Sequence, residues 1–137
     1  MIVLPTSLSR TFWVRLDPDT DVLRGLERAV EEAGIQNGAI LGGVGSLTSY
    51  HFHVVASTNL PPGNDFARGV GPFDIVNING AILGGRVHSH ITLTDTEKTL
   101  GGHLEEGCNV LTFAIILIAE TEGVDLAQWD TVAALEA

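Results

Sequence analysis

The pattern of hydrophobic and polar positions along this chain predicts mostly β-strands. Apolar and polar side chains alternate over residues 9–17, which places Phe12 and Val14 on one face of a strand and Trp13 on the other, as a candidate lateral contact. The continuous apolar run of residues 109–120 is rich in β-branched side chains and predicts a strand covered on both faces. We expect a helix on one side of that strand and a neighbouring subunit on the other.

One stretch has the spacing of a helix instead. Between Asp21 and Ala33, apolar residues recur at intervals of three and four, and Gly34 follows where such a helix would end. Asp19 or Thr20 is the expected N-cap. One helix among six or seven closely spaced strands predicts an α+β fold, in which a mainly antiparallel β-sheet has this principal helix packed on it. The intervals between strands are too short for parallel crossovers.

The middle of the chain is rich in glycine. Residues 38–47 look superficially like a phosphate-binding loop, but no Gly-Lys-Ser/Thr sequence follows, and residues 50–55 alternate as a strand. We interpret the glycines as part of a buried strand, where small residues permit close packing or a bulge. Residues 57–70 predict an irregular loop on which Phe66 and Arg68 are placed to gate a site.

The pattern is less regular at two other places. A turn at Gly71 is expected to start a further strand, which alternates only in part. Residues 125–137 predict a short helix, in which Leu126 and Trp129 pack at three-residue spacing.

Length and composition favour a single globular domain over residues 1–137. The chain has 137 residues, of which 45% are hydrophobic, and this is enough to build one core. Neither a signal peptide nor a run of membrane-spanning length is visible, so we expect a cytoplasmic protein. The single cysteine, Cys108, excludes an internal disulfide and is expected to be a buried structural thiol.

Charge narrows the classes of function further. Seventeen acidic residues against seven scattered basic residues give a net charge of −10. Affinity for nucleic acid comes largely from cations that neutralise phosphates, and this chain has no basic cluster to supply them. Direct DNA binding is therefore disfavoured.

Three of the five histidines fall within residues 84–108, which we predict to form a β-hairpin. The polar residues 95–98 supply the turn. If the loop has two or four residues, His90 lies directly opposite His103 and His88 is its diagonal neighbour, so three imidazoles share one face. A loop of three or five residues would send His103 to the other face.

Three converging imidazoles are a candidate metal site. His88, His90 and His103 suit Zn(II), Ni(II), Cu(II) or Fe(II), and three protein ligands leave one coordination position open. Glu105 falls opposite His88 in the same register, which makes it a candidate fourth ligand or hydrogen-bond acceptor. The alternative is that these are partly exposed strand histidines that hold no ion.

A second His-x-His pair, His51 and His53, shares one face of another predicted strand. No third ligand lies near this pair in the sequence. We therefore expect both histidines to be exposed strand residues outside the site.

Five short motifs occur in an order that carries a family resemblance. They are Arg-Leu-Asp-Pro ahead of the helix, Gly-Ala-Ile-Leu-Gly-Gly-Val-Gly-Ser-Leu at 38–47, Gly-Pro-Phe-Asp-Ile at 71–75, His-Ser-His-Ile at 88–91 and Gly-Gly-His-Leu-Glu-Glu-Gly-Cys at 101–108. In this order they resemble the PPC domain, the plants and prokaryotes conserved family, in its stand-alone prokaryotic form. The resemblance implies an α+β antiparallel sheet, assembly as a homotrimer and a histidine cluster that holds a metal, with His88, His90 and His103 at the matching positions.

Two classes of function follow. The leading hypothesis is a homotrimer that binds a divalent transition metal, expected to be zinc, through the three histidines, with the open position available to a small molecule. Such an ion would activate water or polarise a carbonyl, with Glu105 or Glu106 as the base. The alternative is a non-catalytic assembly or regulatory module that binds protein partners, with DNA association only by analogy to plant family members. A metal that merely ties the hairpin together is a third hypothesis.

Overall fold

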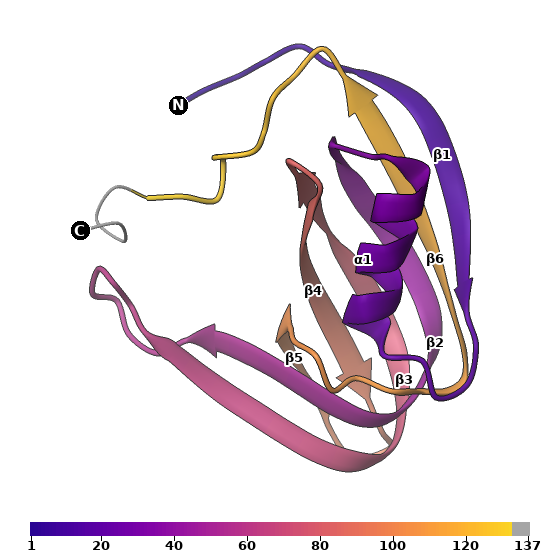
Figure 1. The fold of residues 1–137 in the computed structure, drawn as a ribbon. Coiled ribbons are helices and arrows are strands. Elements are labelled where there is room, and N and C mark those ends of the chain that lie inside the picture. The colour runs from indigo at the N-terminus through magenta and orange to yellow at the C-terminus, as the bar shows by residue number, and fades with distance from the viewer. Residues whose placement is uncertain (133–137) are drawn as a thin grey trace.

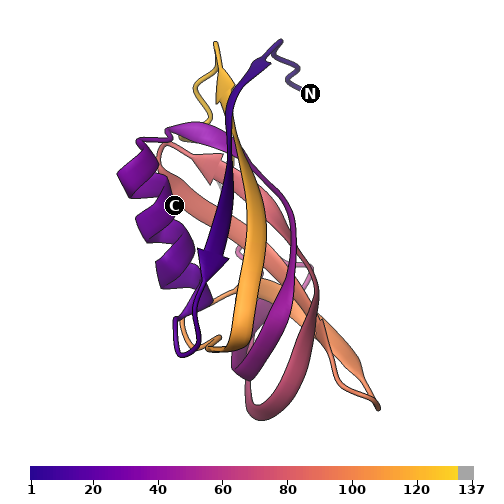
Figure 2. The ribbon, with the colours of Figure 1, turned by 90° about the vertical axis from the view of Figure 1, so that its right-hand side faces the viewer.

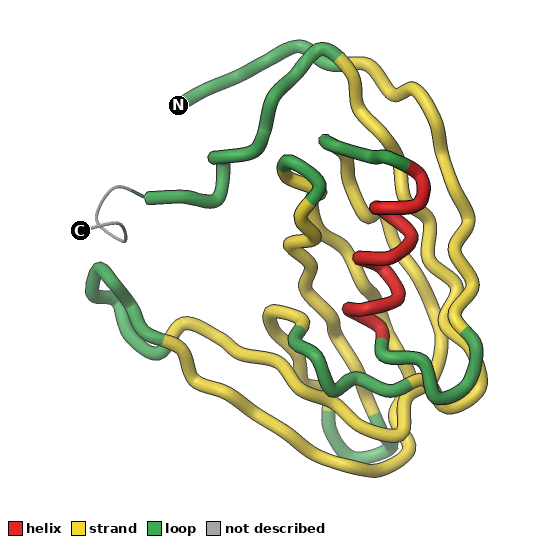
Figure 3. Tube along the Cα trace, in the orientation of Figure 1, coloured by secondary structure: helices red, strands yellow, loops and turns green. Residues whose placement is uncertain are grey.

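Antiparallel strands make up most of the structure. The computed structural model describes residues 1–132. Its elements in chain order are β1 (Ser7–Leu16), α1 (Val22–Ala33), β2 (Asn37–Val55), β3 (Asn64–Leu83), β4 (Arg86–Thr94), β5 (Thr99–Leu104) and β6 (Val110–Glu122). The sheet order is β1-β6-β2-β3-β4-β5, and all of these pairings are antiparallel. The predicted α+β fold, a mainly antiparallel sheet with one principal helix, is confirmed (Figure 3).

The helix α1 covers one face of the curved sheet (Figures 1 and 2). Its apolar stripe, formed by Val22, Leu26 and Val30, is buried against the sheet core. Gly34 ends the helix in the left-handed region, with φ of 68°, which a glycine adopts without steric cost. Within residues 1–132, no helix combines the length and the apolar character needed to cross a membrane.

The predicted N-cap of α1 was wrong. Asp21, and not Asp19 or Thr20, caps the helix, because its carboxylate accepts a hydrogen bond of 3.0 Å from the backbone amide of Arg24. Asp19 instead adopts a left-handed φ of 66° in the preceding turn. The second oxygen of Asp21 accepts a 2.7 Å hydrogen bond from the amide of Gly107. The start of the helix is thereby tied to the segment that follows β5.

The strands β2 and β3 are much longer than the sequence pattern indicated. The expected loop over residues 57–70 was wrong, because residues 64–70 pair with β2 and only residues 56–63 lie between the two strands. Phe66 therefore sits on a strand. Gly71 does not begin a new strand but lies within β3, with φ of 145°. Backbone pairing with β2 outweighs the local turn signals here.

A bend in β2 closes part of the sheet on itself. The pairing of β2 with β3 shifts register between Leu47 and Ser49, and such a bulge sharpens the local bend of a strand. Beyond the bulge, β2 also pairs with β5, where His53 lies opposite His103. The strands β2, β3, β4 and β5 thus form a closed set of neighbours, whose curvature is visible in Figure 1.

The expected C-terminal helix is not formed over residues 125–132. That part of the segment makes isolated turns, in which the amide of Trp129 donates to the carbonyl of Leu126 (3.0 Å). The amide of Leu126 donates to the Asn37 side chain (2.8 Å), and this side chain donates to the carbonyl of Val124 (3.0 Å). These two hydrogen bonds hold the segment to Asn37 of β2. Residues 133–137 of the predicted helix lie outside the described residues.

The two faces of β6 differ in burial. Ala114, Ile116 and Ile118 are fully buried on the face that α1 covers. Leu111 and Phe113 point to the opposite face, where their exposed fractions are 42% and 37%. The expectation that a helix covers one side is confirmed. A subunit on the other side stays a prediction.

Glycine at position 45 is required for the close approach of β2 and β6. A Cβ atom there would lie 2.8 Å from the Cα of Ala114 and would collide with the carbonyl oxygen of Phe113. A Cβ atom at Gly42 on the same strand would meet only the Asn77 side chain, at 3.7 Å, an ordinary contact.

We therefore predict opposite outcomes for two matched substitutions on β2. Gly45→Ala should lower the free energy of unfolding by about 1–3 kcal/mol, because backbone atoms must move to admit the methyl group. Gly42→Ala should change it by less than about 0.5 kcal/mol. Urea unfolding followed by circular dichroism measures both, and equal stabilities would contradict the packing of β2 on β6.

Candidate metal centre

The turn between β4 and β5 sets the register of the hairpin. The carboxylate of Asp95 accepts hydrogen bonds from the amides of Glu97 (2.8 Å) and Lys98 (2.9 Å), and these bonds lower the pKa of Asp95. The four-residue loop 95–98 leaves Thr94 paired with Thr99. The predicted turn is confirmed, and its even number of residues keeps the histidines on one face.

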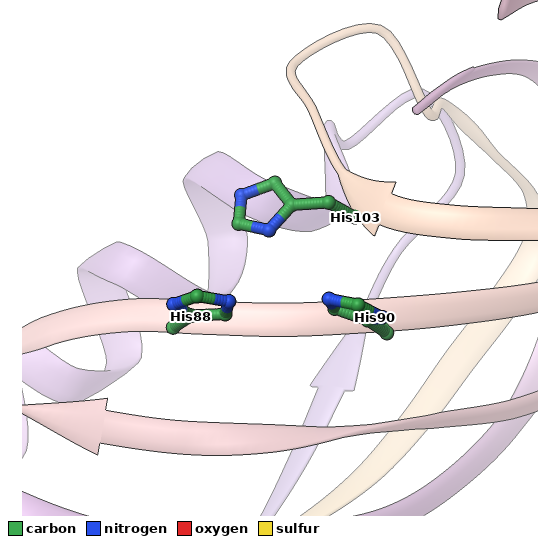
Figure 4. A group of neighbouring side chains, drawn as sticks. All are labelled: His88, His90 and His103. Atoms are coloured by element: carbon green, nitrogen blue, oxygen red, sulfur yellow. The ribbon is translucent and has the colours of Figure 1, made fainter. Parts of the chain in front are cut away.

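His88, His90 and His103 come together as that register requires (Figure 4). His90 lies directly opposite His103, with ring centroids 5.5 Å apart, and His88 is the diagonal neighbour of His103 at 4.7 Å. One potential ligand atom from each ring lies within 4.8 Å of the other two. The intervening Ser89 is buried on the other face of β4.

A fourth histidine, His53, lies beside the other three, and its place in the site was not predicted from the sequence. The four side chains form a histidine row across β4, β5 and β2. His53 on β2 lies opposite His103 on β5, and their ring centroids are only 4.4 Å apart. Its side chain is 17% exposed, so the expectation of an exposed residue was wrong. The pairing of β2 with β5 depends on the bend in β2, a long-range feature that local alternation does not reveal.

Glu105 occupies a different place from the one expected. The chain leaves β5 at Leu104, so Glu105 does not continue the ladder opposite His88. Its Oε1 atom instead lies 2.6 Å from Nδ1 of His53. His53, His103 and Glu105 form a second group that could hold a metal ion, and this group shares His103 with the first.

His51 was also expected to be exposed and is instead buried, with 8% of its surface accessible. Its Nδ1 atom lies 2.7 Å from the carbonyl oxygen of Glu106. Its backbone amide donates to the Cys108 sulfur at 3.3 Å. Burial raises the pKa of the Cys108 thiol to about 11, as suits the structural thiol that was predicted. His51 stands apart from the histidine row.

One ring nitrogen of His88, Nδ1, has a hydrogen-bond partner in the C-terminal segment of the chain. Nδ1 of His88 lies 3.0 Å from Oδ2 of Asp130. The guanidinium of Arg86 donates two hydrogen bonds to the same carboxylate, at 2.9 and 3.1 Å. These bonds hold the pKa of Asp130 far below its usual range. No motif pointed to Asp130, because its role depends on the path of the C-terminal segment.

Two imidazoles of the site, those of His90 and His103, have lowered pKa values. Burial, and then the proximity of His53 and His88, lower the pKa of His103 to about 4. Burial and the same two neighbours also lower the pKa of His90. Metal binding requires deprotonated imidazole nitrogen, so at neutral pH protons hardly compete with an ion at these two residues.

A cavity opens beside the histidine row. It has a volume of about 640 Å³ and lies between the row and the connection from β2 to β3. The residues that line it are His53, Val54, Val55, Pro61, Pro62, Gly63, Asn64, His88, His90, Gly102 and His103. One wall carries imidazole nitrogens and the opposite wall is mainly apolar, a combination typical of small-molecule sites.

The sequence places the chain in a known family. Residues 5–122 match the Plants and Prokaryotes Conserved (PCC) domain, the family abbreviated PPC above, and the chain belongs to it. It is 31% identical over 119 residues to the bifunctional protein GlmU of Synechococcus sp. (strain JA-3-3Ab). The match covers 86% of this chain but only 18% of that protein.

Solved structures support the same fold. A metal-containing protein of Archaeoglobus fulgidus has a TM-score of 0.81 at 22% identity, with 91% of this chain and 89% of that chain covered. A plant- and prokaryote-conserved protein of Pyrococcus horikoshii has a TM-score of 0.78 at 24% identity, with coverages of 91% and 87%. The resemblance seen in the sequence motifs is thereby confirmed at the level of family and fold.

The depressed pKa of His103 predicts a pH dependence of the stability of the metal-free protein. Between the ordinary histidine pKa of 6.5 and the folded value of about 4, the unfolded chain binds a proton that the folded chain does not. The free energy of unfolding should therefore fall as pH is lowered through this window. Urea unfolding in chelator at about pH 7 and about pH 5 measures the loss.

The matched comparison is His103→Gln, which removes the titrating group. This variant should lose less stability than the wild type between the two pH values. Both pH values of the measurement also lie above 4.5, the ordinary pKa of Glu120, whose folded-state pKa is lowered to about 2 mainly by hydrogen bonds from Arg10 and Ser9. An identical loss in both proteins would contradict the neutral, partly buried His103 described above.

Proposed function

We propose that this domain binds a divalent transition metal, zinc, through His88, His90 and His103. The single observation that carries the proposal is the convergence of the three imidazoles on one face of a hairpin, with ligand atoms within 4.8 Å of one another. Nitrogen ligands of this number and type suit zinc, with one position left open. The metal-containing protein of Archaeoglobus fulgidus, which has a similar fold, supports this proposal.

We propose further that the open position serves a small molecule held in the adjoining cavity. The apolar wall formed by Val54, Val55 and the 61–62 prolines would bind the apolar part of such a molecule. A zinc ion at three imidazoles supplies Lewis-acid chemistry. For a hydrolytic role, His53 and its hydrogen-bond partner Glu105 lie beside the site and would supply the base. Glu106 is less suited to that role, because its Oε2 atom forms an ion pair with Nη2 of Arg24 at 2.8 Å.

Elemental analysis of the untagged protein tests the metal proposal. We expect about one zinc ion per chain after reconstitution, and loss of that ion in His103→Gln. His51→Gln is the control, because His51 bonds to Glu106 and not to the cluster. Absence of zinc from the reconstituted wild type would contradict the proposal.

The open position is tested separately with cobalt. In the cobalt-substituted protein, acetohydroxamate should change the visible spectrum if a position is free, since a closed four-coordinate site would not admit it. An unchanged spectrum would favour the structural-metal hypothesis.

A second candidate function, self-assembly and partner binding, rests on a different observation. The face of the sheet opposite α1 carries an apolar strip across β1, β6 and β2. Trp13 pairs with Leu117, and Val44 pairs with Ile115. Trp13 is 72% exposed and Val44 is 56% exposed, which is unusual for neighbouring large apolar residues. We propose that this strip is the subunit contact of the homotrimer that the family resemblance implies.

Sedimentation equilibrium tests the contact. Val44→Glu should shift the wild-type trimer to monomer, because an unpaired charge would be buried in the contact. Val70→Glu, at an exposed position on β3 outside the strip, should leave the assembly unchanged. A monomeric wild type, or a trimeric Val44→Glu protein, would contradict the proposed contact.

A further inference from the structure

The C-terminal segment reaches the metal site through one side chain. Asp130 is 18% exposed, and its Oδ2 atom lies 3.0 Å from Nδ1 of His88. A carboxylate has no proton to give, so Nδ1 of His88 is the donor in this bond. The free nitrogen of His88 is then Nε2, which carries the lone pair that a metal requires.

We infer that Asp130 is a positioning residue for the metal site, and that docking of the C-terminal segment and metal binding reinforce each other. The inference rests on the proposed metal function of His88, His90 and His103. A carboxylate that accepts the second N–H of a histidine fixes its tautomer and ring orientation and strengthens the histidine as a ligand.

Several contacts fix Asp130 in place. Arg86 binds the carboxylate through two hydrogen bonds and also donates to the carbonyl of Ala127 (2.8 Å). Further upstream, the Asn37 side chain holds the segment by donating a hydrogen bond to the carbonyl of Val124 and accepting one from the amide of Leu126. The segment thus approaches the start of β4 along a defined path (Figure 1). Arg86 and His88 point to the same face of β4, where one carboxylate bridges them.

The bridge makes the coupling reciprocal. If docking of the segment strengthens zinc binding by some factor, zinc binding must strengthen docking by the same factor. Zinc should therefore slow hydrogen exchange of the amides in residues 124–132, although none of the three proposed ligands lies in that segment.

The first test uses the tautomer of His88, read by long-range ¹H–¹⁵N correlation in the metal-free protein. In the wild type, His88 should carry its proton on Nδ1. In Asp130→Ala, the Nε2–H form should appear. A purely structural role of Asp130 would leave the tautomer unchanged. This readout needs no metal, so it separates the positioning role from the proposed function.

The second test is zinc affinity, measured by chelator competition. Asp130→Ala should weaken zinc binding by about 10–100-fold. Asp130→Asn keeps the shape of the side chain and one acceptor oxygen, so its zinc affinity should fall by less than that of Asp130→Ala. Asp125→Asn is the matched control, because within residues 1–132 the Asp125 carboxylate accepts a hydrogen bond from the nearby amide of Ala127 (3.0 Å) and from no histidine.

The outcomes are distinct. Weakened binding in Asp130→Ala, with zinc-dependent protection of residues 124–132 in the wild type, supports the inference. Wild-type zinc affinity in Asp130→Ala, or an Nε2–H tautomer of His88 in the wild type, overturns it while leaving the metal function standing. A wild type that binds no zinc overturns the metal function itself.

Discussion

The site depends on the pairing of one short strand with two others. β5 pairs with β4 on one side and with β2 on the other, and the two pairings share His103. Side chains alternate strictly along a strand, so a slip of one residue in either pairing would remove His103 from the row. The turn at 95–98 fixes the first pairing and the bulge in β2 permits the second.

The contacts within the β4–β5 hairpin could be predicted from the sequence, whereas the contacts that β2 and the C-terminal segment make with it could not. Alternation in β4 and an even loop length were enough to place His88, His90 and His103 together, because both signals lie within one hairpin. His53 and Asp130 join the site through tertiary contacts that no window of sequence encodes. Residues 64–70 were misassigned for the same reason, since their strand conformation comes from pairing with β2.

The surroundings of the histidines divide into two kinds. On the cavity side, apolar residues and four imidazoles form a surface with few hydrogen-bond donors or acceptors besides the ring nitrogens. Behind the row, carboxylates bind individual rings, Glu105 to His53 and Asp130 to His88. These two carboxylates orient imidazoles through hydrogen bonds, and neither of them lines the cavity.

The position of the three proposed ligands on a single hairpin has a consequence for how the chain folds. A hairpin closes within microseconds, whereas the pairing of β1 with β6 and the bend of β2 onto β5 join distant parts of the chain and form more slowly. An ion bound by His88, His90 and His103 would hold β4 and β5 in register before those strands arrive. The metal would then affect the order in which the strands pair during folding as well as the folded protein. In its presence, β2 would pair with a β5 strand that is already aligned on β4.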